Sequence, residues 1–184
     1  MSSKTVSDSE VTITELMIPA YANFSGKVHG GTLLSLMDKV AYVCATKYSR
    51  CYCVTVAVER VEFMAPVEVG ELVSLFASVN YVGRSSMIIG IRVESLQPST
   101  GEVKHTNTSM FTMVAKDADG YPTSVPTLMV ETELEARRFL KGKYIKEMSK
   151  QEHQFTDVEI KKIPLADVLS SCAGDNCIFT LSSD

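Results

Sequence analysis

Long apolar runs are missing from this 184-residue sequence. The most apolar stretch, residues 32–45, is interrupted by Asp38 and Lys39 and is shorter than the roughly 20 residues of a membrane-spanning helix. The N-terminal residues contain no apolar signal core, and no glycine follows Met1 to accept a myristoyl group. We therefore expect a cytoplasmic protein without a membrane span.

Clustered positive charge is also missing. The chain has 18 Lys and Arg against 22 Asp and Glu, a formal net charge of −4. Residues 151–184 hold two of the basic and six of the acidic residues, so they account for the whole net charge. Generic binding to duplex DNA or to an anionic membrane needs clustered Lys and Arg and is excluded. A polyanionic small molecule held by a few local cations is not excluded.

Cysteine is sparse and odd in number, with five residues: Cys44, Cys51, Cys53, Cys172 and Cys177. Their spacing does not match the common zinc sites, so we expect no metal. Reduced thiols are expected without an export signal. A chain of this length buries roughly 70% of its unfolded surface on folding, so it needs neither a disulfide bond nor a bound metal for stability.

Periodicity predicts one buried helix. Residues 11–18 form a predicted strand that Pro19 stops, and a glycine-bearing loop follows over residues 21–31. Residues 32–48 then have apolar side chains on nearly every side of a helix. A helix of this kind must be buried nearly all round.

Four segments with period-two alternation follow the helix, over residues 54–59, 72–81, 87–94 and 103–115. Wrapping them around the helix buries both, which predicts an α+β fold with an antiparallel sheet of about five strands. This domain covers residues 1–125. A capping-box pattern predicts a surface helix within residues 126–150. Residues 151–184 are predicted to form an acidic, partly disordered tail.

One carboxylate interrupts the predicted buried helix. Asp38 shares a helix face with Leu34, Ala41 and Ala45, so it is predicted to lie among apolar side chains. Two interpretations stay open: an ion pair with Lys39 or with a cation on the sheet, or a role in catalysis. Adjacent helical residues do not face each other, which weakens Lys39 as the partner.

The loop before the helix ends in Gly30-Gly31, whose backbone N–H groups lie at the predicted helix N-terminus. Such groups can hold a phosphate or a developing oxyanion, although two glycines also simply permit close packing. Asp38 lies about 10 Å further along the helix axis. One chain therefore does not bring both groups to the same atom unless the substrate, a loop or a second subunit bridges the gap.

Three separated motifs carry a family resemblance. Residues 22–38 read Ala-Asn-Phe-Ser-Gly-Lys-Val-His-Gly-Gly-Thr-Leu-Leu-Ser-Leu-Met-Asp, residues 54–58 read Val-Thr-Val-Ala-Val, and residues 83–87 read Gly-Arg-Ser-Ser-Met. In this order they resemble the hotdog-fold acyl-CoA thioesterases of the bacterial YciA and mammalian cytosolic acyl-CoA hydrolase group, over about residues 10–125. The resemblance implies hydrolysis of acyl-CoA thioesters, which we expect to carry medium- to long-chain fatty acyl groups. No cofactor is expected, because coenzyme A is part of the substrate.

The resemblance also implies residue roles. Asn23 and Asp38 match the catalytic pair of the family, with Asp38 as general base or nucleophile and Asn23 orienting the water or donating to the thioester oxygen. The N–H groups around His29, Gly30 and Gly31 would stabilise the oxyanion. A catalytic and a structural role stay open for the His29 side chain.

Other roles concern the substrate and the assembly. Arg84, Ser85 and Ser86 match a segment expected to bind coenzyme A, and Thr55 and Met37 are expected to line the acyl pocket. Because the family builds each site across a dimer and commonly forms hexamers, we expect a homodimer with shared active sites, assembled as a trimer of dimers. Acyl-CoA is the expected partner, and nucleic acid is not.

Two other functions stay open. A hydratase or dehydratase of the same fold uses a His before the helix and an acid within it, and His29 and Asp38 fit this superficially. The His-Phe-Pro-Gly loop and helical Glu of the fatty-acid dehydratases are missing, however. A non-catalytic acyl-CoA sensor usually needs an output domain, and the acidic tail has no DNA-reading pattern.

Overall fold

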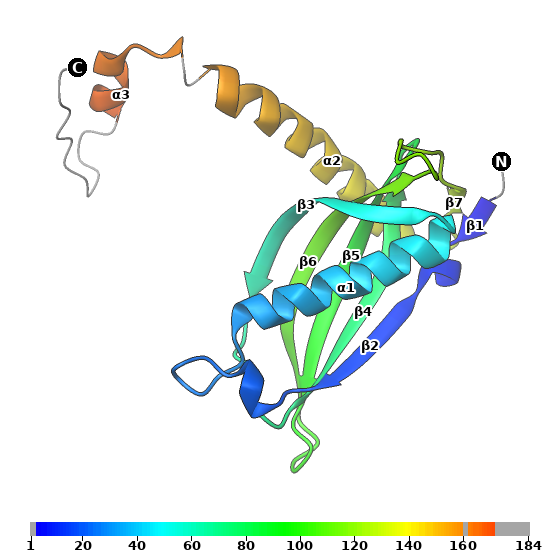
Figure 1. Cartoon of the computed structure of the whole chain (residues 1–184), viewed down its shortest axis with the longest axis vertical. Coiled ribbons are helices and arrows are strands. Elements are labelled where there is room, and N and C mark those ends of the chain that lie inside the picture. The colour runs from blue at the N-terminus through cyan, green and yellow to red at the C-terminus, as the bar shows by residue number, and fades with distance from the viewer. Residues whose placement is uncertain (1–2, 160–161, 172–184) are drawn as a thin grey trace. The chain divides into compact units, whose positions relative to one another are not determined.

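A five-stranded antiparallel sheet curls over one side of helix α1 (Gly30–Ser49) (Figure 1). These elements come from the computed structural model, which describes residues 3–159 and 162–171. Sheet and helix belong to the first of the two units into which the chain divides, residues 1–144 and 145–184. The predicted antiparallel sheet around a central helix is confirmed.

The strands cross the sheet in the order β2, β4, β5, β6 and β3. Their bounds are β2 Val11–Leu16, β3 Tyr52–Phe63, β4 Leu72–Val82, β5 Ser86–Leu96 and β6 Val103–Lys116. β4, β5 and β6 follow one another as hairpins, as the turn signals indicate. β3 pairs with β6 instead of β4, so it forms an edge of the sheet, and its outer side is unpaired within the described residues.

The core lies between the sheet and one face of α1. Tyr48, Leu75, Ile89 and Phe111 are fully buried there. Burying a side chain of this kind contributes about 1.5–3 kcal/mol. Met37 of α1 lies in the same core, so the helix is held against the inner face of the sheet.

The opposite face of α1 is uncovered, so the prediction of a helix buried nearly all round is wrong for a single chain. Leu34, Tyr42 and Val43 are 36%, 39% and 41% exposed, and Asp38 is exposed among them. The physical reason is that this sheet covers only one side of the helix. A contiguous exposed apolar surface of this kind is typical of an interaction site.

Short elements complete the first unit. β1 (Ser3–Thr5) pairs in parallel with β7 (Thr127–Met129), and both strands are too short to show periodicity in the sequence. Two 3₁₀ turns, Ser7–Ser9 and Pro19–Tyr21, flank β2. Lys4 Nζ donates to the backbone oxygen of Tyr48 at 2.6 Å, which places a cation at the negative C-terminal end of α1.

Helix α2 (Glu133–Glu159) begins with the capping box that the sequence predicts. Thr132 Oγ1 accepts from the backbone N–H of Glu135 at 3.2 Å, and Glu135 Oε2 accepts from the backbone N–H of Thr132 at 3.1 Å. In the first unit this helix packs on the outer face of the sheet, where the rings of Phe139 and Tyr81 lie 5.0 Å apart.

The helix does not end by residue 150, as the prediction had it. α2 continues through Glu159, and a short helix, α3 (Leu165–Ser171), follows. Residues 151–159 are rich in Gln and Glu, which favour helix without an apolar period, so periodicity missed them. The rest of the predicted acidic tail, residues 160–161 and 172–184, lies outside the described residues. Among the helices described, none is both long and apolar enough to cross a membrane.

Candidate active site

The loop before α1 holds Asn23 by its side-chain oxygen. Asn23 Oδ1 accepts from the backbone N–H groups of Ser25 (2.9 Å) and Lys27 (3.2 Å) and from Ser25 Oγ (2.7 Å). Because backbone N–H groups only donate, the accepting atom must be the amide oxygen. Asn23 Nδ2 finds no acceptor in the described part of the chain. The loop therefore presents Asn23 as a hydrogen-bond donor.

His29 is the N-cap of α1. Its Nδ1 accepts from the backbone N–H of Gly31 at 2.9 Å, so this nitrogen carries no proton. The backbone N–H of His29 donates to the oxygen of Tyr21 at 2.8 Å. Of the three N–H groups predicted to stabilise an oxyanion, those of His29 and Gly31 therefore already donate hydrogen bonds within the chain. The Gly30 N–H has no acceptor among residues 3–159 and 162–171, so it remains available at the helix start.

A small apolar cavity of about 210 Å³ adjoins Gly30. It is lined by Val28, Leu33 and residues 63–67 as well as Gly30. A Cβ built on Gly30 would lie 3.3 Å from the ring of Phe63, so glycine lets the ring lie close over the helix start. The remaining N–H group and an apolar cavity therefore occur at the same place.

Asp38 is held by a hydroxyl from the sheet. Thr55 Oγ1 donates to Asp38 Oδ1 at 2.6 Å. A β-bulge in β3 interrupts the pairing with β6 between Thr55 and Ala57, directly beside this contact. No cation pairs with Asp38 in the part of the chain that the structure describes, which removes the ion-pair interpretation there. Asp38 Oδ2 makes no hydrogen bond to a described residue, and the Asp38 side chain is exposed.

The hairpin between β4 and β5 carries Arg84, Ser85 and Ser86. Arg84 is exposed and forms no ion pair with a described residue. The residue after Ser86 pairs with Met113 of β6, which in turn pairs with Thr55 of β3. The start of β5 therefore lies in the row of Thr55, two strands away, or about 10 Å at the usual strand spacing.

Met37 and Thr55, which are predicted to line an acyl pocket, lie on different elements. Met37 is fully buried in the core, and Thr55 contacts Asp38. Neither lines the cavity beside Gly30. Sequence reasoning missed the contact between Thr55 and Asp38, because alternation along β3 carries no information about which side chain of α1 lies opposite.

The predicted site residues fall into three places in one chain. Asn23 lies in the loop that leads to Gly30 at the start of α1, Asp38 lies midway along α1 beside Thr55 of β3, and Arg84 lies on the hairpin. Gly30 and Asp38 are eight residues apart, or about 12 Å along the helix. One chain thus does not bring the oxyanion donors and the carboxylate to a single reacting carbon.

Two of the described cysteines, Cys44 and Cys53, are poor nucleophiles. Cys44, Cys51 and Cys53 are free thiols. Burial raises the pKa of Cys44 to about 12, and burial also raises the pKa of Cys53. Both thiols therefore stay protonated near neutral pH, and a protonated thiol is a poor nucleophile.

Comparison with known proteins identifies the family. The profile of the thioesterase superfamily matches residues 25–113. The VdlD protein of Helicobacter pylori is 44% identical over 135 residues, which cover 73% of this chain and 77% of that protein. YkhA of Bacillus subtilis, named as an uncharacterized acyl-CoA thioester hydrolase, is 34% identical over 128 residues, which cover 70% and 74%. The chain belongs to the hotdog-fold acyl-CoA thioesterases.

Solved structures share the fold of this thioesterase. A hexameric acyl-CoA thioesterase in its apo form is 33% identical, with a TM-score of 0.80 over 83% of this chain and 98% of the other. An acyl-CoA hydrolase of Staphylococcus aureus, in complex with butyryl-CoA, coenzyme A and coenzyme A disulfide, is 25% identical, with a TM-score of 0.79 over 86% and 96%. Variants of the Staphylococcus enzyme with alanine in place of an Asp, an Asn or a Thr also share the fold.

Proposed function

We propose that this thioesterase hydrolyses medium- to long-chain fatty acyl-CoA to the free acid and coenzyme A, with Asp38 as general base. The pair of Asp38 and Thr55 carries the proposal. The hydroxyl of Thr55 orients one carboxylate oxygen at 2.6 Å, and the other oxygen, on an exposed side chain, has no hydrogen-bond donor among the described residues. A carboxylate held in this way, without a neutralising cation among the described residues, is suited to take a proton from a water.

In the proposed reaction, the water oxygen attacks the thioester carbonyl carbon as Asp38 takes the water proton. The carbonyl π electrons move to the oxygen, and the Gly30 N–H and Asn23 Nδ2 donate hydrogen bonds to the resulting oxyanion. Collapse of the tetrahedral intermediate breaks the carbon–sulfur bond and expels the thiolate of coenzyme A. The proton on Asp38 then passes to the thiolate or to solvent. Because a thiolate is a good leaving group, no separate strong acid is needed.

A second copy of the chain is proposed to complete each site. The uncovered face of α1 continues onto the free edge strand β3, where Val56 and Val58 are 56% and 44% exposed. Asp38 lies in this apolar surface, which is the kind of patch that protein interfaces cover. A partner docked there would bring its own Asn23 and Gly30 to Asp38. The hexameric relative supports a further assembly into a trimer of dimers.

The Staphylococcus enzyme supports the residue roles. Its substituted Asn, Asp and Thr are 15 and 17 residues apart along its chain. Asn23, Asp38 and Thr55 have the same types, the same order and the same separations of 15 and 17 residues. This agreement supports Asn23 and Asp38 as the catalytic pair and adds Thr55 as a residue that positions Asp38.

The positions of the two ends of the substrate, coenzyme A and the acyl chain, are proposed from the residues that surround each position. Arg84 is proposed to pair with the phosphates of coenzyme A, with Ser85 and Ser86 beside it. An exposed guanidinium that pairs with no carboxylate among the described residues suits phosphate. The apolar cavity beside Gly30 is proposed to take the start of the acyl chain.

Release of free thiol from palmitoyl-CoA tests the activity. Steady release by the wild-type protein is expected, and Asp38→Asn should lower kcat by about 10²- to 10⁴-fold in a protein that still unfolds cooperatively. A near wild-type rate for Asp38→Asn would refute the assignment. Hydration of an enoyl-CoA without thiol release would favour a hydratase, and tight binding without turnover would favour a sensor.

Mixed variants test the shared site. Asn23→Ala and Asp38→Ala protomers are each inactive in this scheme, but a hybrid dimer contains one site with both residues intact. Random exchange makes half of the dimers hybrids, so activity should recover to about 25% of the wild-type value. No recovery after verified subunit exchange would place the whole site within one chain.

A further inference from the structure

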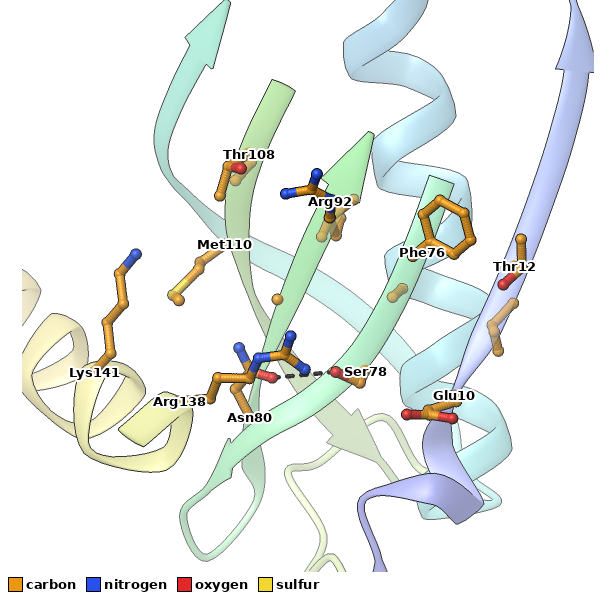
Figure 2. A pocket seen from close by; sticks show the side chains of 15 residues that line it. Glu10, Thr12, Phe76, Ser78, Asn80, Arg92, Thr108, Met110, Arg138 and Lys141 are labelled. Atoms are coloured by element: carbon orange, nitrogen blue, oxygen red, sulfur yellow. Dashed lines mark hydrogen bonds between the residues drawn. The ribbon is translucent and has the colours of Figure 1, made fainter. Parts of the chain in front are cut away.

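A second and larger cavity lies on the face of the sheet opposite α1, between the strands and the first part of α2 (Figure 2). Its volume is about 400 Å³, within the usual range for small-molecule sites. Residues of β2, β4, β5, β6 and α2 line it. Because the sheet separates this cavity from Asp38, a substrate carbonyl at Asp38 does not occupy it.

The floor of this outer cavity is polar and buried. Ser78 and Asn80 line it and are only 9% and 6% exposed. Ser78 Oγ donates to Asn80 Oδ1 at 3.2 Å (Figure 2), so the amide oxygen is used. Asn80 Nδ2 has no acceptor among the described residues. This amide nitrogen is therefore available to donate to an acceptor on a ligand in the cavity.

The backbone around Asn80 is shaped to hold this amide. The pairing of β4 with β5 is irregular between Val79 and Tyr81, so Asn80 lies at a β-bulge, a feature that re-aims a side chain. Gly90 of β5 lies beneath it, and a Cβ built there would lie 2.1 Å from Asn80 Nδ2. The amide thus occupies the space that any other residue at position 90 would need.

The rim of the outer cavity is cationic. Arg138 and Lys141 come from α2, are exposed, and form no ion pair within the described residues. Arg138 extends from the helix toward β4, whereas Glu10 lies at the opposite margin beside β2 (Figure 2). Arg92 is already paired with a neighbouring glutamate at 2.6 Å. Arg138 and Lys141 against Glu10 leave a net charge of +1 around the Asn80 amide donor.

We propose that this outer cavity binds a phosphate-bearing small molecule. Phosphate oxygens accept only, which matches Asn80 Nδ2, the guanidinium of Arg138 and the ammonium of Lys141. Phe76, 40% exposed on the same lining, offers an apolar surface to the organic part of such a ligand. The site is separate from the hydrolytic one and does not depend on the proposed catalytic roles.

Calorimetric titration of the full-length protein at low salt tests this proposal, with inorganic pyrophosphate and ADP as separate probes. Both probes are expected to bind if phosphate alone is recognised, and ADP alone or more tightly if a ring is recognised as well. The double substitution Arg138→Ala/Lys141→Ala should weaken binding by about 10-fold or more. The control Arg137→Ala/Lys143→Ala removes the same charge from the same helix outside the cavity lining and should bind like the wild type.

Two further variants test the contribution of the cavity floor to binding separately from the contribution of positive charge at the rim. Asn80→Ala removes the amide donor, and Gly90→Ala displaces it. Each should weaken binding without changing the net charge. Thermal unfolding checks that each protein folds. Absence of binding to the wild-type protein, or equal binding by the Arg138→Ala/Lys141→Ala protein, would overturn the proposal. Loss of binding in Arg84→Ala instead would assign the probe to the coenzyme A site. If the wild-type protein binds neither probe and the Arg138→Ala/Lys141→Ala protein changes its oligomeric state, the cavity belongs to a subunit interface.

Discussion

Replacing Thr55 with valine keeps the shape of the side chain and removes the hydroxyl that donates to Asp38 Oδ1 at 2.6 Å. A hydrogen bond to a charged group contributes about 1.5–3 kcal/mol, and solvent access to Asp38 favours the lower end of that range. Since about 1.4 kcal/mol corresponds to a tenfold change in rate, kcat should fall about 10-fold. KM should stay nearly unchanged, because Thr55 acts through Asp38 and not on the substrate.

Steady-state thiol release with saturating acyl-CoA measures this effect. Thr55→Ser keeps the hydroxyl and should retain most of the wild-type kcat, which makes it the matched control. In the Asp38→Ala background, adding Thr55→Val should change the residual rate little, because the hydrogen bond is already lost. An equal loss from Thr55→Val in both backgrounds, or equal loss from the Ser and Val variants, would refute the positioning role.

Two further predictions concern stability. His29→Ala should lower the free energy of unfolding by about 1 kcal/mol because it removes the N-cap, and His29→Asn should restore it; loss of kcat in both variants at unchanged stability would instead indicate a catalytic His29. Burial alone would raise the pKa of Glu71, but hydrogen bonds from Lys104 Nζ (2.7 Å) and a backbone N–H (3.1 Å) outweigh it and hold the pKa below its usual 4.5. A lowered folded-state pKa means that the stabilisation is complete above pH 4.5 and is lost as the pH falls through the lower value. The difference in urea stability between wild type and Glu71→Gln should therefore shrink from pH 7 toward acid, and a constant difference would contradict this account.

The elements of the fold were largely predictable because each has a local signal. Alternation marked four strands, the apolar run marked α1, and the reciprocal bonds of Thr132 and Glu135 at α2 follow from the capping-box spacing. The place of β3 was not predictable. It follows α1 and precedes β4 in sequence, yet it pairs with β6, because strand pairing depends on contacts between distant residues.

The candidate site was predictable in its residue types but less so in its contacts. Asp38 stood out as a carboxylate in an apolar helix, and a pattern based on one chain predicted it to be buried. The structure has it exposed, since one sheet covers only one face of α1. Gly30 and Gly31 were equivalent in the sequence, but the cap formed by His29 uses the N–H of Gly31 and leaves that of Gly30.

The sequence by itself determined which side chains could do chemistry, since Asn23, Asp38 and Arg84 are defined by their types, their spacing and the elements that carry them. Only the tertiary structure decided how they are held. The contact from Thr55 to Asp38 joins residues 17 positions apart on different elements, and the cavity floor at Asn80 needs a bulge on one strand beside a glycine on the next. Such contacts arise from strand register and packing, which no local pattern encodes.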